Sequence, residues 1–199
     1  MSRYTPRDAS DLTQMIREEV LGLVTTCDDH GFITTPLPLL AELDDAGEVR
    51  ALIGHFARAN PHVARAQATP RAQISFFGPH GYISPAMVSK PDWGPTWNYR
   101  LAQFEVDIVF EPGREHAVIC ALADALEGQD WSVERMGDRY ASLTAHVIAF
   151  RAPVVRSSAR FKLGQDESET SFEEICSALG DSALARAMRS QRTDRDPTK

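Results

Sequence analysis

The sequence predicts a mainly β domain with peripheral helices, and three features of the chain indicate this fold class. Between residues 103 and 110, an apolar residue stands at every second position, as in a half-buried antiparallel strand. Turn sequences rich in Asp and Gly, at 28–31 and 44–47, separate apolar segments with strand composition. Helical periodicity is limited to a few short segments. A sheet of this kind removes its exposed edges by closing into a small barrel, which is the architecture we expect.

The first part of the chain is predicted to form one helix and three strands. A capping-box pattern begins at Thr5, and apolar residues at helical spacing continue it to about Glu19. Strands at 20–27, 32–40 and 49–53 are joined by the two turns, which predicts a three-stranded antiparallel meander. Two prolines in the second of these strands place it at a sheet edge or in an irregular stretch.

The remaining elements follow from the same patterns. Asn60-Pro61 combines a favoured N-cap with a favoured first helical residue, so a short helix begins there and ends near Ala68. The other predicted strands span 72–77, 82–84, 97–110 and 143–155, and the other predicted helices span 115–126, 172–179 and 183–188. We therefore expect one domain at 1–166, a C-terminal helical appendage at 167–190 and a flexible tail at 191–199.

The size and charge of the chain restrict its class. Its 199 residues suffice for one domain with a full core, and 43% hydrophobic and 25% charged residues are typical of soluble globular proteins. The formal net charge of -7 does not support DNA as a direct partner, because DNA-binding domains usually carry a basic face. A local basic patch is not excluded by the total charge, so DNA stays an open partner.

The cysteines indicate the cellular location of the protein, and the cysteines and histidines argue against a metal site. The three cysteines are odd in number and lack C-x-x-C spacing, so we expect reduced thiols in a cytoplasmic protein. The six histidines form neither an H-x-x-x-H nor an H-E-x-x-H pair, and no metal site is expected. The first eleven residues contain no apolar signal core, and no segment approaches the ~18 apolar residues of a membrane span.

The segment 54–61, GHFARANP, contains groups that could hold an anion. Arg58 stands two residues before the helix start at Asn60-Pro61, and His55 offers another donor. Backbone N–H groups at a helix N-terminus, together with an arginine, stabilise a phosphate. An ordinary strand-to-helix connection with a surface arginine has the same composition, and from composition alone that interpretation is the more common one.

Two other groups of residues have more than one interpretation. Residues 77–85 and 95–99 are rich in Pro, Gly and aromatic side chains, which suits an interface, a wall for a planar ligand, or a tight turn packed on the core. Four basic residues could face an anionic partner or form a solvated face; they are Arg151, Arg156, Arg160 and Lys162. No P-loop, dinucleotide-binding glycine motif or nucleophile–base pair is present, so the catalytic residues stay unassigned.

Three segments taken together resemble one family. Residues 54–61 resemble its GH-x-ARANP block, 77–85 (FGPHGYISP) with 95–99 (PTWNY) resemble its GPHAYISP…PTWNY block, and 161–165 (FKLGQ) resemble its KLSQ block. The chain is therefore similar, over about residues 3–166, to the PaiB-like, FMN-binding negative transcriptional regulators. The resemblance implies an FMN-binding split β-barrel of the pyridoxamine-phosphate-oxidase type, which forms a homodimer with FMN at the subunit interface.

The resemblance also implies a set of flavin contacts. The strand 32–40 would flank the flavin ring, the connection before the short helix would hold the phosphate, and the strand after residue 95 would reach the flavin from the partner chain. The implied cofactor-binding residues are Thr34, Thr35, Pro36, His55, Arg58, Ala59, Asn60, Trp97, Asn98 and Lys162. The chain departs from the family at Pro36, at Met87 and at Asp166-Glu167, which concern the ring contacts and a C-terminal anionic contact.

Three functions are compatible with this resemblance. The first is a flavin-binding negative transcriptional regulator, which acts on DNA directly or indirectly through flavin-dependent metabolism. The second is an FMN-dependent oxidoreductase for a small molecule, in which the cofactor performs the electron chemistry and the protein orients the reactants. The third is a dimeric scaffold without flavin.

Overall fold

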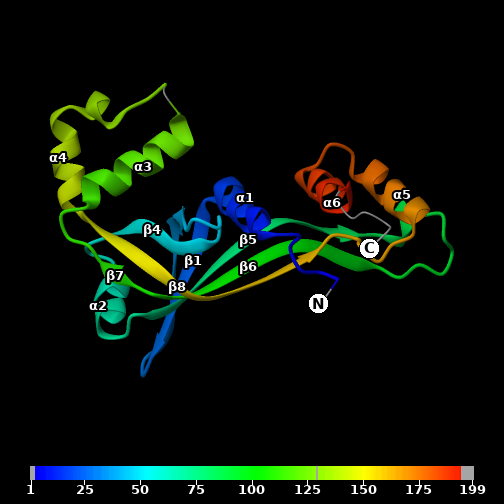
Figure 1. Cartoon of the computed structure of the whole chain (residues 1–199), viewed down its shortest axis with the longest axis horizontal. Helices are drawn as coiled ribbons and strands as arrows, with labels where there is room; N and C mark the ends of the chain where they lie inside the picture. The colour runs from blue at the N-terminus through cyan, green and yellow to red at the C-terminus, as the bar shows by residue number, and fades with distance from the viewer. Residues whose placement is uncertain (1–2, 129, 194–199) are drawn as a thin grey trace. The chain divides into compact units, whose positions relative to one another are not determined.

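The computed structural model describes residues 3–128 and 130–193, which form an eight-stranded antiparallel sheet with peripheral helices (Figure 1). The strands are β1 (Leu21–Asp28), β2 (Gly31–Pro38), β3 (Leu40–Leu43), β4 (Val49–Ala57), β5 (Arg71–Ile83), β6 (Thr96–Asp107), β7 (Val109–Phe110) and β8 (Val147–Lys162). The helices are α1 (Ala9–Glu19), α2 (Pro61–Ala68), α3 (Glu115–Glu127), α4 (Asp138–Ala145), α5 (Glu169–Leu179) and α6 (Ala183–Thr193), with short 3-10 helices η1 (Pro85–Met87) and η2 (Val133–Met136). The predicted fold class is confirmed.

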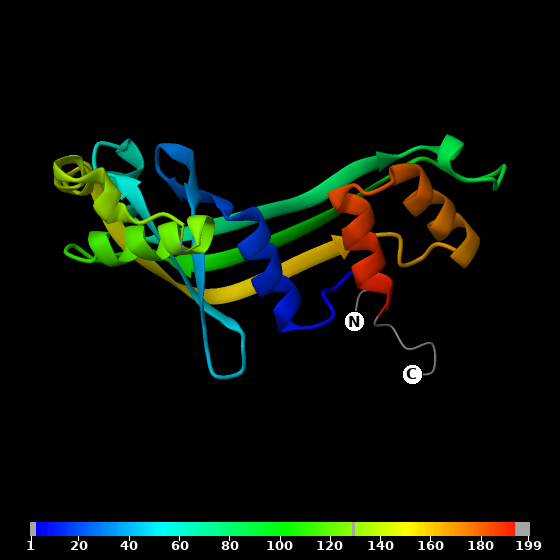
Figure 2. The same ribbon diagram turned by 90° about the horizontal axis from the view of Figure 1, so that it is seen from above.

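The sheet has the strand order β2-β1-β5-β6-β8-β4-β3, and β7 pairs with β8. The expected three-stranded meander is wrong, because β1–β2 and β3–β4 are separate hairpins that occupy opposite ends of this order. Their tips point to opposite sides in Figure 2. The chain leaves β2 at Leu39, whose side chain is fully buried and whose N–H donates to the carbonyl of Val20 at 2.9 Å. The two prolines at positions 36 and 38 have no N–H to offer a further strand.

The chain divides into two compact units. The larger unit contains residues 9–76 and 103–158, and the smaller unit contains residues 3–8, 77–102 and 159–193 of the described chain. Strands β5, β6 and β8 contribute residues to both units. The expected division into a domain at 1–166 and an appendage at 167–190 stays a prediction.

The core of the larger unit is aromatic and aliphatic. The rings of Phe56 and Phe150, from the paired strands β4 and β8, lie 5.1 Å apart, and both side chains are fully buried. Helix α3 covers the other face of this strand pair, where Val118 and Leu122 pack on Ala149. This arrangement places the start of α3 beside the end of β4, where the candidate site lies.

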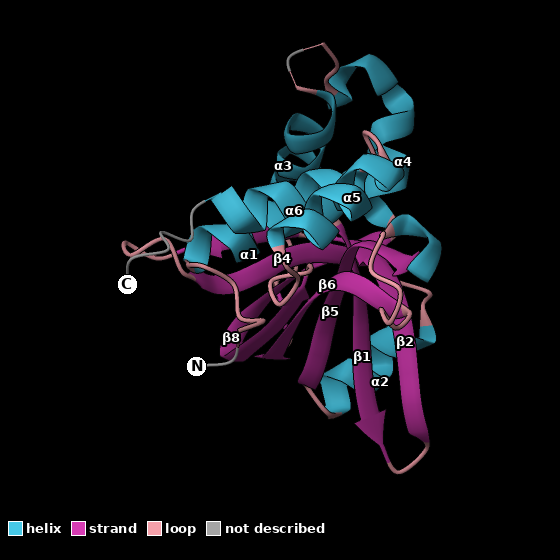
Figure 3. Ribbon diagram, turned by 90° about the vertical axis from the view of Figure 1, so that its right-hand side faces the viewer, coloured by secondary structure: helices cyan, strands magenta, loops and turns pink. Residues whose placement is uncertain are grey.

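The smaller unit packs α5 and α6 side by side on one face of its strands (Figure 3). Phe161, Phe172 and Met188 are buried between the helices and the strands. Gln191 is buried and helical, so the expected tail is wrong for residues 191–193, because α6 continues through them. The rest of that expected tail, 194–199, lies outside the described residues.

Three other boundaries differ from the sequence expectation. The first helix begins at Ala9 rather than Thr5, because Tyr4 accepts a backbone hydrogen bond from Phe161 at 2.7 Å and the segment before the helix is held in the smaller unit. The strands expected at 72–77 and 82–84 form the single strand β5, since pairing with neighbouring strands overrides local breaker residues. Residues expected to begin the last strand at 143 lie in α4 instead.

Candidate functional site

Two segments of the larger unit that contain predicted site residues lie close together. Thr34, Thr35 and Pro36 belong to β2, which is an end strand of the sheet, while residues 54–60 run from β4 into the connection before α2. A Cβ added at Gly54 would lie 2.6 Å from Cδ2 of Leu39 and 3.0 Å from the carbonyl oxygen of Pro38. The glycine therefore permits close approach between β4 and the end of β2.

The start of α2 has the predicted cap. Asn60 is extended at φ -68° and ψ 125°, and its side-chain oxygen accepts a hydrogen bond from the N–H of His62 at 2.9 Å. Pro61 has no N–H, and the N–H of Val63 donates to the carbonyl of Asn60 at 3.0 Å. The first donors of the helix are thus used within the protein, and they do not form the open phosphate cradle that the sequence suggested.

One backbone donor just before the helix is unused. The N–H of Arg58 donates to His146 at 2.8 Å, and that of Asn60 donates to Ala57 at 2.9 Å. Between them, the N–H of Ala59 has no acceptor in the described chain, and this residue is exposed. An exposed N–H without a protein acceptor can donate to a ligand anion.

Arg58 is anchored rather than free. Its Nη2 donates to Oε1 of Glu115 at 2.8 Å and its Nε donates to the carbonyl of Ala145 at 3.1 Å. Nη1 makes no hydrogen bond to any residue that the structure describes. Glu115 also accepts from the N–H of Gly113 at 2.7 Å, and backbone hydrogen bonds hold the pKa of this carboxyl below its usual value. The pair is neutral, so Arg58 offers a ligand a fixed hydrogen-bond donor rather than net charge.

His55 faces α3. It pairs with Ala149, and directly opposed residues of an antiparallel pair share a face, here the one covered by α3. Its Nδ1 is buried without a hydrogen-bond partner among the described residues, and burial lowers the pKa of the imidazole. A buried polar atom without a partner in the protein is a candidate for contact with a ligand.

Thr34 and Thr35 point to opposite faces of β2, as successive strand residues do. The hydroxyl of Thr34 lies 2.9 Å from that of Thr25 on β1. The hydroxyl of Thr35 lies 2.9 Å from Nδ1 of His62 and accepts from Nδ2 of Asn60 at 3.4 Å. The structure therefore brings Thr35 and Asn60 together, whereas Thr34 joins neither.

His62, which contacts Thr35 and Asn60, is a residue of this region that the sequence analysis did not single out. It is fully buried, and its Nε2 lies 3.0 Å from the hydroxyl of Thr26. Burial lowers the pKa of this imidazole, and the nearby charge of Arg65 lowers it further. The sequence feature that could have identified His62 is its position, directly after the block 54–61 and inside the first turn of the predicted helix.

The other three predicted residues lie in the smaller unit, where they are neighbours but their side chains have different partners. Asn98 is buried and its Nδ2 lies 3.5 Å from the sulfur of Met188 on α6. Trp97 is 48% exposed and donates from its indole N–H to His80 at 3.4 Å. Lys162 donates to the hydroxyl of Thr96 and to the carbonyl of Trp97. Asn98 therefore serves the packing under α6, while Trp97 is open to a partner.

Trp97 belongs to an exposed group of aromatic side chains, which we call the aromatic face. The rings lie 4.7–6.3 Å apart and come from β5 and β6 of the smaller unit. Its members are Phe77, His80, Tyr82, Trp97 and Tyr99. Of the interpretations of this segment, the open arrangement favours an interface or a ligand wall over a tight turn packed on the core.

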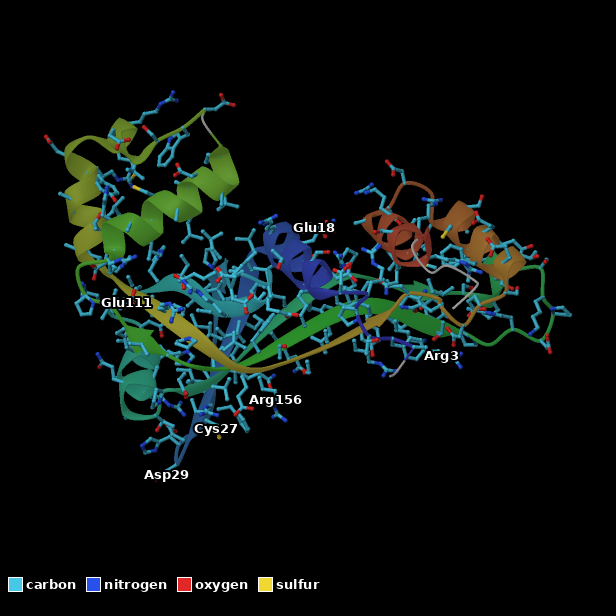
Figure 4. All side chains as sticks on the ribbon, in the orientation of Figure 1. Arg3, Glu18, Cys27, Asp29, Glu111 and Arg156 are labelled. Atoms are coloured by element: carbon cyan, nitrogen blue, oxygen red, sulfur yellow. The ribbon has the colours of Figure 1, made fainter. Side chains whose placement is uncertain are left out.

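A cavity of about 550 Å³ opens elsewhere on the larger unit. Its lining includes Cys27 and Arg156, which are labelled in Figure 4. Arg71 binds Asp107 at 2.7 Å, and both Arg71 and Arg156 bind Glu105, so the charges of this cavity compensate one another. The cavity contains none of the predicted site residues.

Metal and membrane features were sought in the described residues. Nowhere between residues 3 and 193, residue 129 aside, do three His, Cys, Asp or Glu side chains form a group that could hold a metal ion. Among the helices of the same residues, none has the length and apolar character needed to cross a membrane.

Comparisons with known proteins show what the chain is similar to. A family model described as "Putative FMN-binding domain" matches residues 1–156. "Protease synthase and sporulation protein PAI 2" of Bacillus subtilis is 26% identical over 186 residues, which cover 86% of this chain and 84% of that protein.

Solved structures have the same fold. The FAD and heme binding protein from Mycobacterium smegmatis has a TM-score of 0.61 at 15% identity, covering 89% of this chain and 80% of that one. The flavocytochrome Anf3 from Azotobacter vinelandii has a TM-score of 0.60 at 12% identity, covering 79% and 69%. At these identities the likeness concerns the fold alone, and it agrees with the predicted β fold with peripheral helices.

Proposed function

The chain belongs to the FMN-binding domain family, and from this premise we propose that it is a PaiB-like regulator that acts through bound FMN rather than through direct DNA contact. FMN is the cofactor of this family. When bound, FMN supplies electron transfer, and the residues of the protein bind it, orient it and exclude water.

One observation carries the proposed flavin site. Three polar groups without a protein partner in the described chain occur within residues 55–59: Nδ1 of His55, Nη1 of Arg58 and the N–H of Ala59. A phosphate requires several N–H donors, and it is favoured by an arginine whose orientation is already fixed. This segment, beside Thr35 and Asn60, therefore fits the phosphate end of FMN.

The edge of β2 suits the flavin ring. β2 pairs with β1 and is an end of the sheet, so its outer backbone groups are available to a planar ligand with hydrogen-bonding edges. Pro36 is exposed on this strand and removes one donor from it. We infer that the ring lies along residues 34–36, with its phosphate toward 55–60.

The regulatory role is proposed in its indirect form because the basic residues of β8 in the larger unit are already paired. Arg151 binds Glu42 at 2.7 Å, and Arg156 binds Glu105 at 2.9 Å. A nucleic-acid contact needs cations that can release counterions from phosphates, and paired arginines serve this poorly. The formal net charge of -7 agrees with this view.

A homodimer in the cytoplasm is part of the proposal. The aromatic face offers a contact region, since Phe77, Tyr82 and Trp97 are each about half exposed and exposed apolar clusters mark interaction sites. Trp97 from a second copy is the residue best suited to reach the flavin. All three cysteines are unpaired, as in a reducing compartment.

The test is titration of the purified protein with FMN, followed by quenching of flavin fluorescence. We expect saturable binding, with riboflavin binding more weakly because it lacks the phosphate. Absence of quenching with FMN would refute the flavin site. A specific DNA complex that survives physiological salt would replace the indirect regulator with a direct one, and FMN-stimulated NAD(P)H oxidation would favour the oxidoreductase.

A further inference from the structure

A closed ring of hydrogen bonds joins Thr35, Asn60 and His62. Oδ1 of Asn60 accepts from the N–H of His62 at 2.9 Å, Nδ1 of His62 lies 2.9 Å from Oγ1 of Thr35, and Nδ2 of Asn60 donates to the same Oγ1 at 3.4 Å. The ring connects β2 to the start of α2. Each member thereby fixes the orientation of the other two.

The imidazole of His62 is the fully buried member of this ring. Its other nitrogen, Nε2, lies 3.0 Å from the hydroxyl of Thr26, so the side chain spans from β1 to β2. Its ring packs against that of Phe56, on β4, in a T-shaped arrangement with centroids 5.2 Å apart. One buried side chain therefore touches both strands of the first hairpin and the strand that leads into the proposed phosphate segment.

The surroundings of His62 favour its neutral form. Its polar side-chain partners are two hydroxyls, and the nearest charged group on its own helix is Arg65. The carboxylate of Asp28 is committed to Arg65, with Nε of Arg65 donating to it at 2.6 Å. A proton added to His62 would place a second positive charge beside Arg65 in a buried position, which is costly.

Protonation would also disturb the ring of hydrogen bonds. In the tautomer that carries its hydrogen on Nε2, Nδ1 accepts the hydroxyl hydrogen of Thr35, whose oxygen accepts from Asn60, while Nε2–H donates to Thr26. A proton on Nδ1 turns this acceptor into a donor, and the hydroxyl hydrogen of Thr35 loses its acceptor. The orientation of Thr35, and of the β2 edge around it, is then no longer fixed.

We propose that His62 is a positioning residue of the flavin site, which holds Thr35 and Asn60 in their binding arrangement as a neutral imidazole and releases them when protonated. This inference rests on the proposed function, because it assumes that Thr35 and Asn60 contact FMN. It assigns to the site a dependence on pH that originates in the protein and not in the ligand.

The experiment compares FMN dissociation constants of the unaltered protein and His62→Gln between pH 7.5 and 5.5. The phosphate of FMN itself titrates near pH 6, and the ratio of the two constants at each pH cancels this effect because the ligand is the same. We expect a ratio of about five at pH 7.5, which is the effect of one hydrogen bond, and a smaller ratio at pH 5.5, where a larger share of His62 is protonated. A merely structural role gives a ratio that does not depend on pH.

Two further variants complete the test. His116→Gln makes the same change at an exposed histidine of α3. The ratio of its FMN dissociation constant to that of the unaltered protein should stay near one at every pH. Thr26→Val removes the partner of Nε2 without touching residues 34–36 or 55–60, and it should raise the dissociation constant two- to threefold at pH 7.5 even if His62→Gln does not fold.

The outcomes separate this inference from the proposed function. A constant ratio for folded His62→Gln, or unchanged binding by folded Thr26→Val, overturns the role of His62 while FMN binding by the unaltered protein stands. If the unaltered protein binds no FMN, the flavin site and this inference fail together.

Discussion

Nη2 of Arg58 and Oε1 of Glu115 lie 2.8 Å apart, and this ion pair fastens the connection between β4 and α2 to the first residue of α3. The two side chains differ in environment, since that of Arg58 is 45% exposed and that of Glu115 is 9% exposed. Water therefore reaches the cation while the carboxylate is held inside. The pair fixes the arginine but also neutralises it, and both effects can be measured.

The variant Glu115→Gln should strengthen FMN binding. The amide oxygen can still accept from Arg58, although the NH2 group that replaces the other oxygen cannot accept from the N–H of Gly113, and the neutral side chain no longer cancels the positive charge that attracts a phosphate. We expect the FMN dissociation constant to fall two- to fivefold and the stability to fall by about 1 kcal/mol, because the solvated cation makes the pair weak. Fluorescence titration and urea unfolding measure the two changes, and a weaker FMN complex would contradict the prediction.

The variant Arg58→Ala should weaken FMN binding by about 1.5–3 kcal/mol, the usual contribution of a charged hydrogen bond. Riboflavin is the control ligand, because it lacks the phosphate and its affinity should hardly change. The double variant Arg58→Ala with Glu115→Gln removes the unpaired carboxylate that the single change leaves behind. Equal loss for FMN and riboflavin would show that Arg58 does not contact the phosphate.

Acidification from pH 7.5 to 5.5 should destabilise the protein through His55 and His62. Burial lowers the pKa of both imidazoles in the folded state, so the unfolded chain binds more protons once the pH falls to the ordinary histidine value. The stability that the two neutral imidazoles contribute is fully present above about pH 6.5 and is lost as the pH falls. At pH 5.5 the free energy of unfolding is lower by at most about 1.4 kcal/mol per histidine. Urea midpoints at the two pH values test this, and His62→Gln should reduce the difference.

The variant Gly54→Ala should destabilise the larger unit by about 1–3 kcal/mol, because the added methyl group has no room. It would lie 2.6 Å from Cδ2 of Leu39 and 3.0 Å from the carbonyl oxygen of Pro38, so β4 and the end of β2 must move apart. Gly94→Ala is the matched control, since a Cβ there meets nothing within 4 Å. Equal denaturation midpoints for the two variants would contradict the close approach.

Polar replacements on the aromatic face should disrupt the proposed dimer. Phe77→Ser with Tyr82→Ser removes two side chains that are about half exposed, and light scattering after gel filtration should then report the mass of one chain. Leu126→Ser is the control, because this leucine is 56% exposed on α3 and lies outside the aromatic face. A dimer that persists in the double variant would place the contact elsewhere.

The sequence by itself determined the elements whose signals are local. The cap at Asn60 and the helix 61–68 are confirmed, because an N-cap is satisfied by a residue only two positions away. The alternation in 103–110 likewise predicted strand structure, since the direction of a strand side chain depends only on its position in the strand. The motif blocks identified the family, and the family model that matches residues 1–156 confirms it.

Only the tertiary structure decided which of these elements meet. Arg58 and Glu115 are 57 positions apart, Thr35 and His62 are 27 positions apart, and β2 and β4 belong to hairpins at opposite ends of the strand order. No local pattern encodes such pairs, because their contact depends on the closure of a long loop and on the packing of every strand between them. The segment that could hold an anion could therefore be predicted from the sequence. The pairing of Glu115 with Arg58 and the contact of His62 with Thr35 could not be predicted from it.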